Sequence, residues 1–157
     1  MATKDRIYID KELVQLADQL VKRQIQGSDS VQGVFRDTRE LAVFAAGLGY
    51  RKKRTRTVTE QGREVKLAAV ERIEVGGSDL VSALSVAVRG NVAVLTPDRA
   101  LERAEIFEQY VNGGLDYIAG IAGEEGSDLA IVAHIVKSEH APREAREEVL
   151  DLLSQRL

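Results

Sequence analysis

The chain has 157 residues, 44% of them hydrophobic and 30% charged, so it can bury one ordinary core, and we expect a single domain over residues 1–157. Its formal net charge is −3, and the absence of cysteine excludes a disulfide framework, a thiolate nucleophile and a thiolate metal site. The first residues are too polar for a secretory signal, and no segment reaches the ~18 to 20 apolar residues of a membrane span, so we expect a cytoplasmic protein without membrane contacts.

The N-terminal unit, residues 1–50, begins with a strand and a helix. Residues 6–10, RIYID, alternate polar and apolar side chains, which predicts a short strand with one buried face. In residues 11–25 the apolar side chains recur at spacings of three and four, which predicts a surface helix with one packed side. Residues 26–36 contain two glycines and two serines without a clear period, so we expect a loop of about ten residues before the next helix.

A second helix is predicted after this loop. Asp37 can cap it, and Glu40, three residues later, supplies the partner of a capping box. The apolar run that follows is typical of a helix buried by its neighbours, and Gly49 is expected to end it in the left-handed conformation. Residues 51–77 then form a basic loop and a minor β element, which the β-branched side chains place near residues 65–75.

The C-terminal part, residues 78–157, is predicted to be helical. A strongly apolar helix over residues 79–88 is closed by Gly90. A brief extended piece follows it and ends at Thr96, which caps the next helix, with Pro97 at the first helical position.

The longest predicted helix runs from Pro97 to about Ile121. Its expected buried stripe consists of Leu101, Ala104, Phe107, Val111, Leu115 and Ile118. The pair Gly113-Gly114 costs a helix about 1 kcal/mol per residue against alanine, so it either bends this helix or lets another backbone come close. Pro142 opens a last amphipathic helix. The fold we expect is therefore mainly α, a single helical domain with a short N-terminal strand and a minor β element near the middle.

A basic stretch stands out in this acidic chain. Residues 51–66 carry seven basic and two acidic side chains, a local net of +5, whereas residues 98–157 carry 13 acidic and six basic ones. Such a cluster attracts DNA phosphates without choosing a base sequence, because each neutralised phosphate releases counterions. The cations expected to contact DNA are Arg51, Lys52, Lys53, Arg54, Arg56 and Arg63. A solvated loop and docking on an acidic partner protein are the alternatives.

Little in the chain is typical of an enzyme. It lacks the motifs GxxxxGK[ST], GxSxG and HExxH, and His134 and His140 lie six residues apart without a further ligand at metal spacing. Asn112, before two glycines, could cradle an anion or cap a broken helix, but a kink that permits tight helix packing is the simpler interpretation. We therefore predict no catalytic residues, no metal site and no cofactor.

Two segments resemble a known family. AAGLGYRKKR and IFEQYVNGGLDYI, in this order and at this spacing within residues 34–136, resemble the Dnd-system-associated protein 4 family, also described as DNA phosphorothioation-associated protein 4. Members accompany bacterial gene clusters that replace a non-bridging phosphate oxygen of DNA by sulfur, or that restrict DNA lacking this mark. The resemblance implies a non-enzymatic accessory of this defence system, which contacts the DNA backbone or proteins of the Dnd modification or restriction complex. It carries over no catalytic residues.

A weaker resemblance concerns residues 4–50. Their strand and two helices have the order of a ribbon-helix-helix unit, and the DndE component of the same systems is built in a similar way. In such a dimer the outward strand side chains, here Arg6 and Tyr8, would read the major groove of DNA. The long loop over residues 26–36 and the acidic Asp37, at a helix start where a phosphate would normally sit, count against it. A homodimeric ribbon-helix-helix regulator of transcription is therefore the alternative function.

Overall fold

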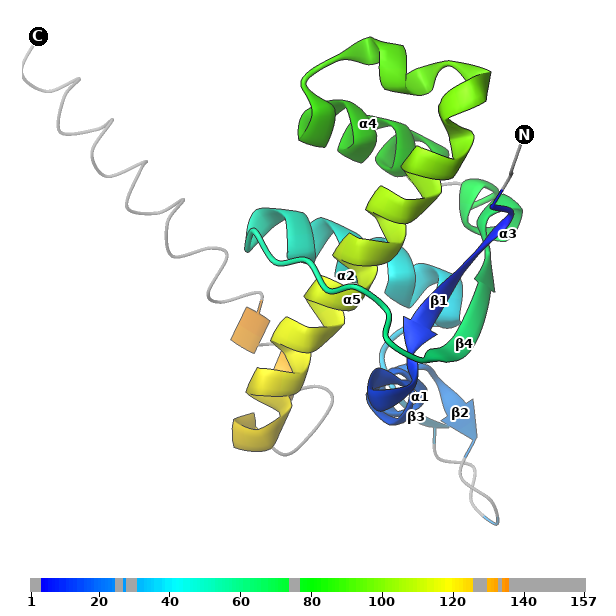
Figure 1. Cartoon of the computed structure of the whole chain (residues 1–157). Helices are drawn as coiled ribbons and strands as arrows, with labels where there is room; N and C mark the ends of the chain where they lie inside the picture. The colour runs from blue at the N-terminus through cyan, green and yellow to red at the C-terminus, as the bar shows by residue number, and fades with distance from the viewer. Residues whose placement is uncertain are drawn as a thin grey trace, which may run out of the picture.

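The computed structural model describes residues 4–24, 27, 31–73, 77–125, 130–132 and 134–135 of the chain. In that part the fold is mainly α with two small two-stranded sheets, so the expected fold class is confirmed (Figure 1). Within these ranges, every helix is too short or too polar to span a lipid bilayer. The last predicted helix, from Pro142, lies outside the described residues.

Strand β1, Arg6–Asp10, has the alternating burial that the sequence predicts. Ile7 and Ile9 are fully buried, whereas Tyr8 between them is half-buried. The strand pairs antiparallel with β4, Gln61–Lys66, and the register shifts by a bulge after Tyr8. The minor β element is therefore present, although it begins before the predicted range.

The other edge of β1 is occupied by helix α5, Ala100–Glu125. The Tyr8 N–H donates to the Glu108 carboxylate at 2.8 Å, and the Asn112 side-chain amide donates to the Tyr8 C=O at 2.9 Å. The Asp10 N–H in turn donates to the Asn112 side-chain oxygen at 2.8 Å. A ribbon-helix-helix dimer needs this strand free to pair with its copy in the partner. Because both edges of β1 are used within one chain, the ribbon-helix-helix interpretation is wrong for this fold.

The first helix is shorter than predicted. After a 3-10 turn, α1 spans Val14–Leu20 and does not fill the predicted range. It ends there because the chain turns extended and Lys22 donates its N–H to the Phe35 C=O at 2.7 Å, a bond that a continued helix would exclude. Strands β2, Arg23–Gln24, and β3, Val31–Gln32, then pair antiparallel where the helix end and the loop were expected.

Helix α2, Thr38–Arg51, begins as predicted and ends later than predicted. The Asp37 carboxylate accepts the Glu40 N–H at 3.0 Å, and the Glu40 carboxylate accepts the Arg36 N–H at 2.6 Å. Two side chains thus bind backbone N–H groups reciprocally at the helix start, as in a capping box. Gly49 does not end the helix but is one of its buried residues. The helix ends within the basic stretch instead.

Helices α2 and α5 cross at the centre of the fold (Figure 1), and glycines lie where the two helices meet. A Cβ built on Gly114 would lie 1.8 Å from the Ala45 C=O oxygen, and one built on Gly49 would lie 2.3 Å from the Tyr110 C=O oxygen. Both distances are far below van der Waals contact, so only glycine lets the two backbones approach this closely. Of the two roles predicted for Gly113-Gly114, close approach of another backbone is therefore confirmed.

The buried stripe predicted for α5 is largely confirmed. Its buried members are Ala104, Phe107, Val111, Leu115 and Ile118. Leu101 is only half-buried. The helix begins three residues after the predicted start, because Pro97–Arg99 form a separate 3-10 turn. Thr96 stands at the N-cap position of that turn, but its hydroxyl donates to the Ala93 C=O at 2.8 Å and does not cap the turn.

Two further helices complete the described fold. Helix α3, Leu67–Glu71, follows β4 directly, so the predicted β element ends earlier than expected. Helix α4, Gly77–Arg89, ends at Gly90, whose φ of +66° is the left-handed conformation that the sequence predicts. The piece after it is a 3-10 turn, Val92–Leu95, and not the extended segment that was expected.

Candidate nucleic-acid interface

The basic stretch begins where the chain leaves α2 in a tight turn. The Lys53 N–H donates to the Tyr50 C=O at 3.1 Å, and the Arg54 N–H donates to the Gly49 C=O at 2.8 Å. These two bonds form a Schellman motif, which needs one residue in the left-handed conformation, and Lys53 fills that position with a φ of 54°. The end of α2 is therefore a defined turn and not an irregular loop.

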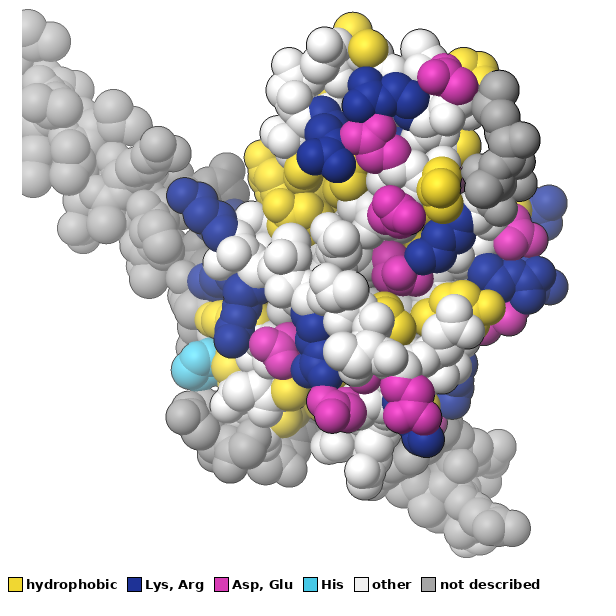
Figure 2. Space-filling model, viewed as in Figure 1, with side chains coloured by type: hydrophobic (Ala, Val, Ile, Leu, Met, Phe, Trp, Pro, Cys, Tyr) yellow, Lys and Arg dark blue, Asp and Glu magenta, His cyan; other side chains and the backbone are white. Residues whose placement is uncertain are grey.

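Four consecutive cations, Arg51–Arg54, lie at this point, and we call them the basic turn. Arg51, Lys53 and Arg54 are exposed, and Lys52 is half-buried. Figure 2 shows Lys and Arg side chains gathered on the left of the molecule, over the end of α2. The C-terminal end of a helix is the negative pole of its dipole, which favours cations in this position.

Helix α5 holds two cations of the basic turn. The Lys52 Nζ lies 5.3 Å from the centre of the Tyr117 ring and the Arg54 Cζ lies 5.7 Å from it, both within the range of cation–π attraction. Arg54 also lies 3.4 Å from a carboxylate oxygen of Asp116. These contacts restrict both side chains while they remain at the surface.

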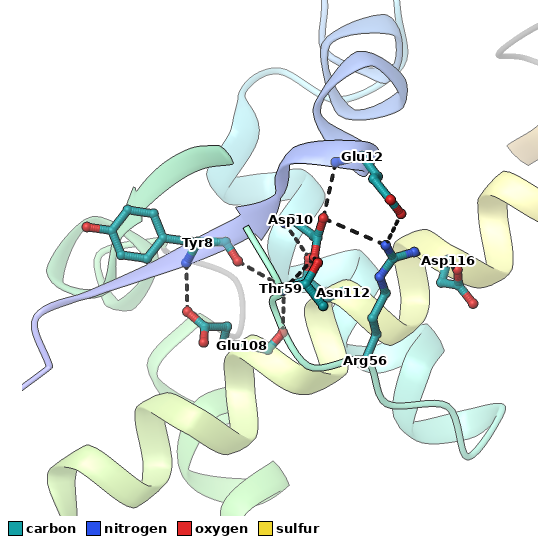
Figure 3. Close-up of polar contacts among 8 residues, drawn as sticks. All are labelled: Tyr8, Asp10, Glu12, Arg56, Thr59, Glu108, Asn112 and Asp116. Atoms are coloured by element: carbon teal, nitrogen blue, oxygen red, sulfur yellow. Dashed lines mark hydrogen bonds and ion pairs between the residues drawn. The ribbon is translucent and has the colours of Figure 1, made fainter. Parts of the chain in front are cut away.

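Arg56 is directed away from the basic turn, into a polar cluster between α5 and the N-terminal segment (Figure 3). Its guanidinium lies 2.5 Å from the Glu12 carboxylate, 3.0 Å from Asp116 and 3.7 Å from Asp10. The hydrogen bond with Glu12 raises the pKa of Arg56 above its ordinary value, and the bond with Asp116 adds to this against the opposing effect of burial. The positive charge of Arg56 is thus balanced by carboxylates within the fold.

Asp10 is the buried centre of this cluster. Its carboxylate accepts the Thr59 N–H at 2.8 Å, the Thr59 hydroxyl at 3.0 Å and the Glu12 N–H at 3.1 Å. Burial alone would raise the pKa of Asp10, but these hydrogen bonds and the nearby charge of Arg56 together bring it below its ordinary value. Asp10 is therefore ionised in the folded protein and ties the segment after the basic turn to β1.

Asn112 connects α5 to β1 beside this cluster (Figure 3). It is fully buried, and its amide also donates to the Glu108 C=O at 2.9 Å. Its side-chain atoms are used within the fold, in hydrogen bonds to β1 and to α5 itself, a role that was not predicted for it. The bonds with β1 could not be seen in the sequence, because Asp10 and Asn112 are 102 positions apart.

Arg63 lies on β4, apart from the basic turn. Its guanidinium is 2.6 Å from the carboxylate of Asp18 on α1. The pair borders a shallow groove that Lys11 and Glu60 also line, and these two side chains form an ion pair at 2.6 Å. Four of the six predicted DNA-contact residues thus lie in the basic turn, where Arg54 shares the Asp116 carboxylate with Arg56. Arg56 and Arg63 lie outside the turn, and both are paired with carboxylates.

The charged residues of the described ranges show no arrangement of metal ligands. No three His, Cys, Asp or Glu side chains in those ranges are placed to hold a metal ion. His134 is exposed, and His140 lies outside the ranges. The carboxylates that do converge lie around Arg56, whose guanidinium balances their charge.

Comparison with known proteins bears on the role of these features. The model of a family described as DNA sulphur modification system-associated protein 4 matches residues 6–155. The comparisons with curated proteins and with solved structures found no match. The matched range includes the basic turn, the polar cluster around Arg56 and both central helices.

Proposed function

Because the chain belongs to the family of DNA sulphur modification system-associated protein 4, we propose that it is a non-catalytic accessory protein that binds DNA through its phosphate backbone. The contact is made by the basic turn. In this proposal the protein acts in the bacterial cytoplasm, beside the proteins that introduce the sulfur mark or restrict DNA without it.

The observation that carries the proposal is the presentation of four consecutive cations on a fixed turn. Arg51, Lys53 and Arg54 are exposed, so their charges are accessible to a large polyanion. Tyr117 and the Schellman motif restrict the turn before any ligand arrives, and a preorganised site loses less conformational entropy on binding. Each phosphate that a cation neutralises then releases counterions.

The same features favour DNA binding that does not depend on the base sequence. The strand that a ribbon-helix-helix protein would insert in the major groove is enclosed between β4 and α5. The tips of lysine and arginine on a turn contact phosphates, which position a protein on DNA but carry no base information. We therefore expect weak binding that falls as salt rises and depends little on the base sequence.

A second candidate function is docking on another protein of the same system. It is favoured by two apolar side chains in the 3-10 turn after α4, since Val92 is 70% exposed and Leu95 is 41% exposed. Apolar surface of this kind marks protein contact sites when it is contiguous. In that case the basic turn would meet an acidic surface of the partner.

Fluorescence anisotropy with labelled duplex DNA distinguishes the two candidates. We expect binding at low salt that weakens steadily as salt is raised, with similar affinities for two duplexes of unrelated sequence. Undetectable binding at low salt would overturn the proposal and favour protein docking. A strong preference for one duplex would also contradict it, because the basic turn offers no readout of bases.

A further inference from the structure

The basic turn contains a backbone conformation that lysine adopts at a cost. In the part of the chain that the structure describes, Lys53 is the only residue other than glycine with a positive φ, at 54°. It stands at the position of the Schellman motif that glycine usually occupies, because a Cβ crowds the backbone in the left-handed conformation. Glycine would therefore be the more stable residue at position 53.

The surrounding contacts keep Lys53 in this conformation. On one side, the bonds of the turn to the end of α2 fix its backbone. On the other side, the chain runs directly over α5: a Cβ on Gly113 would lie 2.0 Å from the Arg54 C=O oxygen, and the Arg56 N–H donates to the Gln109 C=O at 3.0 Å. The chain must reverse at position 53 to reach this path, so the strain cannot relax.

The side chain of Lys53 makes no contact that would compensate for this cost. It is exposed, and within the described ranges it has neither an ion pair nor a hydrogen bond from its ammonium group. Its neighbours differ, because Lys52 and Arg54 both lie against the Tyr117 ring. Strained backbone conformations cluster at functional sites, where a side chain serves a purpose other than stabilising the fold.

We infer that Lys53 makes a principal phosphate contact of the basic turn, and that its left-handed backbone persists because glycine there would remove that contact. The inference rests on the proposed function and deepens it. It assigns to Lys53 a direct contact with a phosphate oxygen of the DNA backbone, whereas the packing of Lys52 and Arg54 on α5 orients the turn.

The replacement Lys53→Gly tests this, because stability and DNA binding should change in opposite directions. We expect the melting temperature to rise by about 2 to 4 °C as the strain is removed. We expect the affinity for a labelled duplex at low salt to fall about two- to fivefold, and the slope of log affinity against log salt to lose about one unit, since one fewer counterion is released. Thermal unfolding followed by circular dichroism and anisotropy titrations at several salt concentrations measure the two effects.

Three further variants make the result specific. Lys53→Ala loses the charge but keeps the Cβ, so it should weaken binding as the glycine variant does without raising the melting temperature. Lys53→Arg keeps the charge and should keep the salt slope. Lys66→Gln removes one exposed charge from the end of β4, on the other side of the molecule from the basic turn (Figure 1), and should leave the salt slope unchanged.

The outcomes separate this inference from the proposed function. If wild-type protein does not bind DNA at low salt, both fail. If wild type binds and Lys53→Gly binds with the same affinity and salt slope, the inference is overturned while DNA binding by the other cations stands. A melting temperature of Lys53→Gly at or below that of wild type would also overturn it, since the lysine would then not be strained.

Discussion

Asp10 holds a negative charge inside the protein. Burial opposes this, but the amides of Thr59 and Glu12 and the guanidinium of Arg56 outweigh burial and keep the pKa of Asp10 below its ordinary value. A carboxyl group with a lowered pKa in the folded state stabilises the fold above its unfolded pKa of about 3.9, and this contribution is lost as the pH falls through the folded pKa. The polar cluster is therefore a source of acid sensitivity.

Replacing Asp10 by asparagine keeps the size of the side chain but exchanges one acceptor oxygen for an amide donor. In either orientation of the side chain that donor faces other donors, the Thr59 amide and hydroxyl at one position or the Glu12 amide and the Arg56 guanidinium at the other. We therefore expect the free energy of unfolding at neutral pH to fall by about 2 to 4 kcal/mol. Urea unfolding at about pH 7 and about pH 3 measures this. The difference from wild type should shrink at the lower pH, because the stabilisation that the lowered pKa provides declines once the pH is below the unfolded pKa of about 3.9.

A matched control is Asp5→Asn, on an exposed carboxylate that pairs with Arg6 at the surface. It should change the stability at neutral pH much less, because exposed ion pairs contribute little. If Asp10→Asn cost the same amount at both pH values, the charge of Asp10 would not be the cause.

Arg56 differs from the exposed cations of the basic turn because its charge is paired with carboxylates within the fold. With Glu12, Asp116 and Asp10 around its guanidinium, Arg56→Gln should lower the free energy of unfolding by about 1 to 2 kcal/mol. It should leave the salt slope of DNA binding by the folded protein unchanged, because its charge is already balanced. A loss of about one unit of slope would instead support the prediction that Arg56 contacts a phosphate.

The contacts within the polar cluster around Asp10 and Arg56 could not be predicted from the sequence. Asp10 and Thr59 are 49 positions apart, and Asp10 and Asn112 are 102 apart, so no local pattern joins them. The basic stretch could be recognised from charge alone. Charge alone does not distinguish Arg56, which is directed inward, from Arg54, which is exposed.

Elements with a local signal were predicted well. The alternation of β1, the capping box at Asp37, the long α5 and the glycine after α4 depend on residues close in sequence, and all are present. Predictions failed where contacts between residues far apart in the sequence determine where a helix ends. Helix α1 stops early because Lys22 bonds to Phe35. Gly49 lies in the contact with α5, and the left-handed residue after α2 is Lys53 instead.

The crossing of α2 and α5 depends on glycine at the contact. Gly114→Ala would place a Cβ 1.8 Å from the Ala45 C=O oxygen, so the helices must separate, and we expect a loss of at least about 2 kcal/mol or failure to fold. Gly120 lies on the same helix with nothing within 4 Å of an added Cβ. Gly120→Ala should therefore raise the stability by about 0.5 to 1 kcal/mol through helix propensity. Urea unfolding of both variants measures the contrast, and equal effects would contradict the close packing.

At the scale of the whole molecule, the charge distribution constrains how DNA can approach. The chain has a net charge of −3, so long-range attraction to DNA is weak and binding must depend on a local cluster. Buried hydrophobic side chains from β1 to residue 135 belong to one cluster, which supports the crossing of α2 and α5. The basic turn projects from that crossing.

The central claim is that DNA is bound by the basic turn and not by positive charge in general. The direct measurement compares two triple variants with the same change in net charge. In one, the three cations of Lys52–Arg54 are replaced by glutamine. In the other, glutamine replaces Lys22, Lys66 and Arg72, which are exposed outside the turn. Circular dichroism first establishes that both variants are folded.

Anisotropy titrations of a labelled duplex over a range of salt then give the affinity and its salt slope for each. We predict that the Lys52–Arg54 variant binds at least about tenfold more weakly at low salt and loses about two to three units of slope, since up to three fewer counterions are released. The control variant should keep the wild-type slope. Equal losses in both variants, or wild-type binding by the Lys52–Arg54 variant, would contradict the claim.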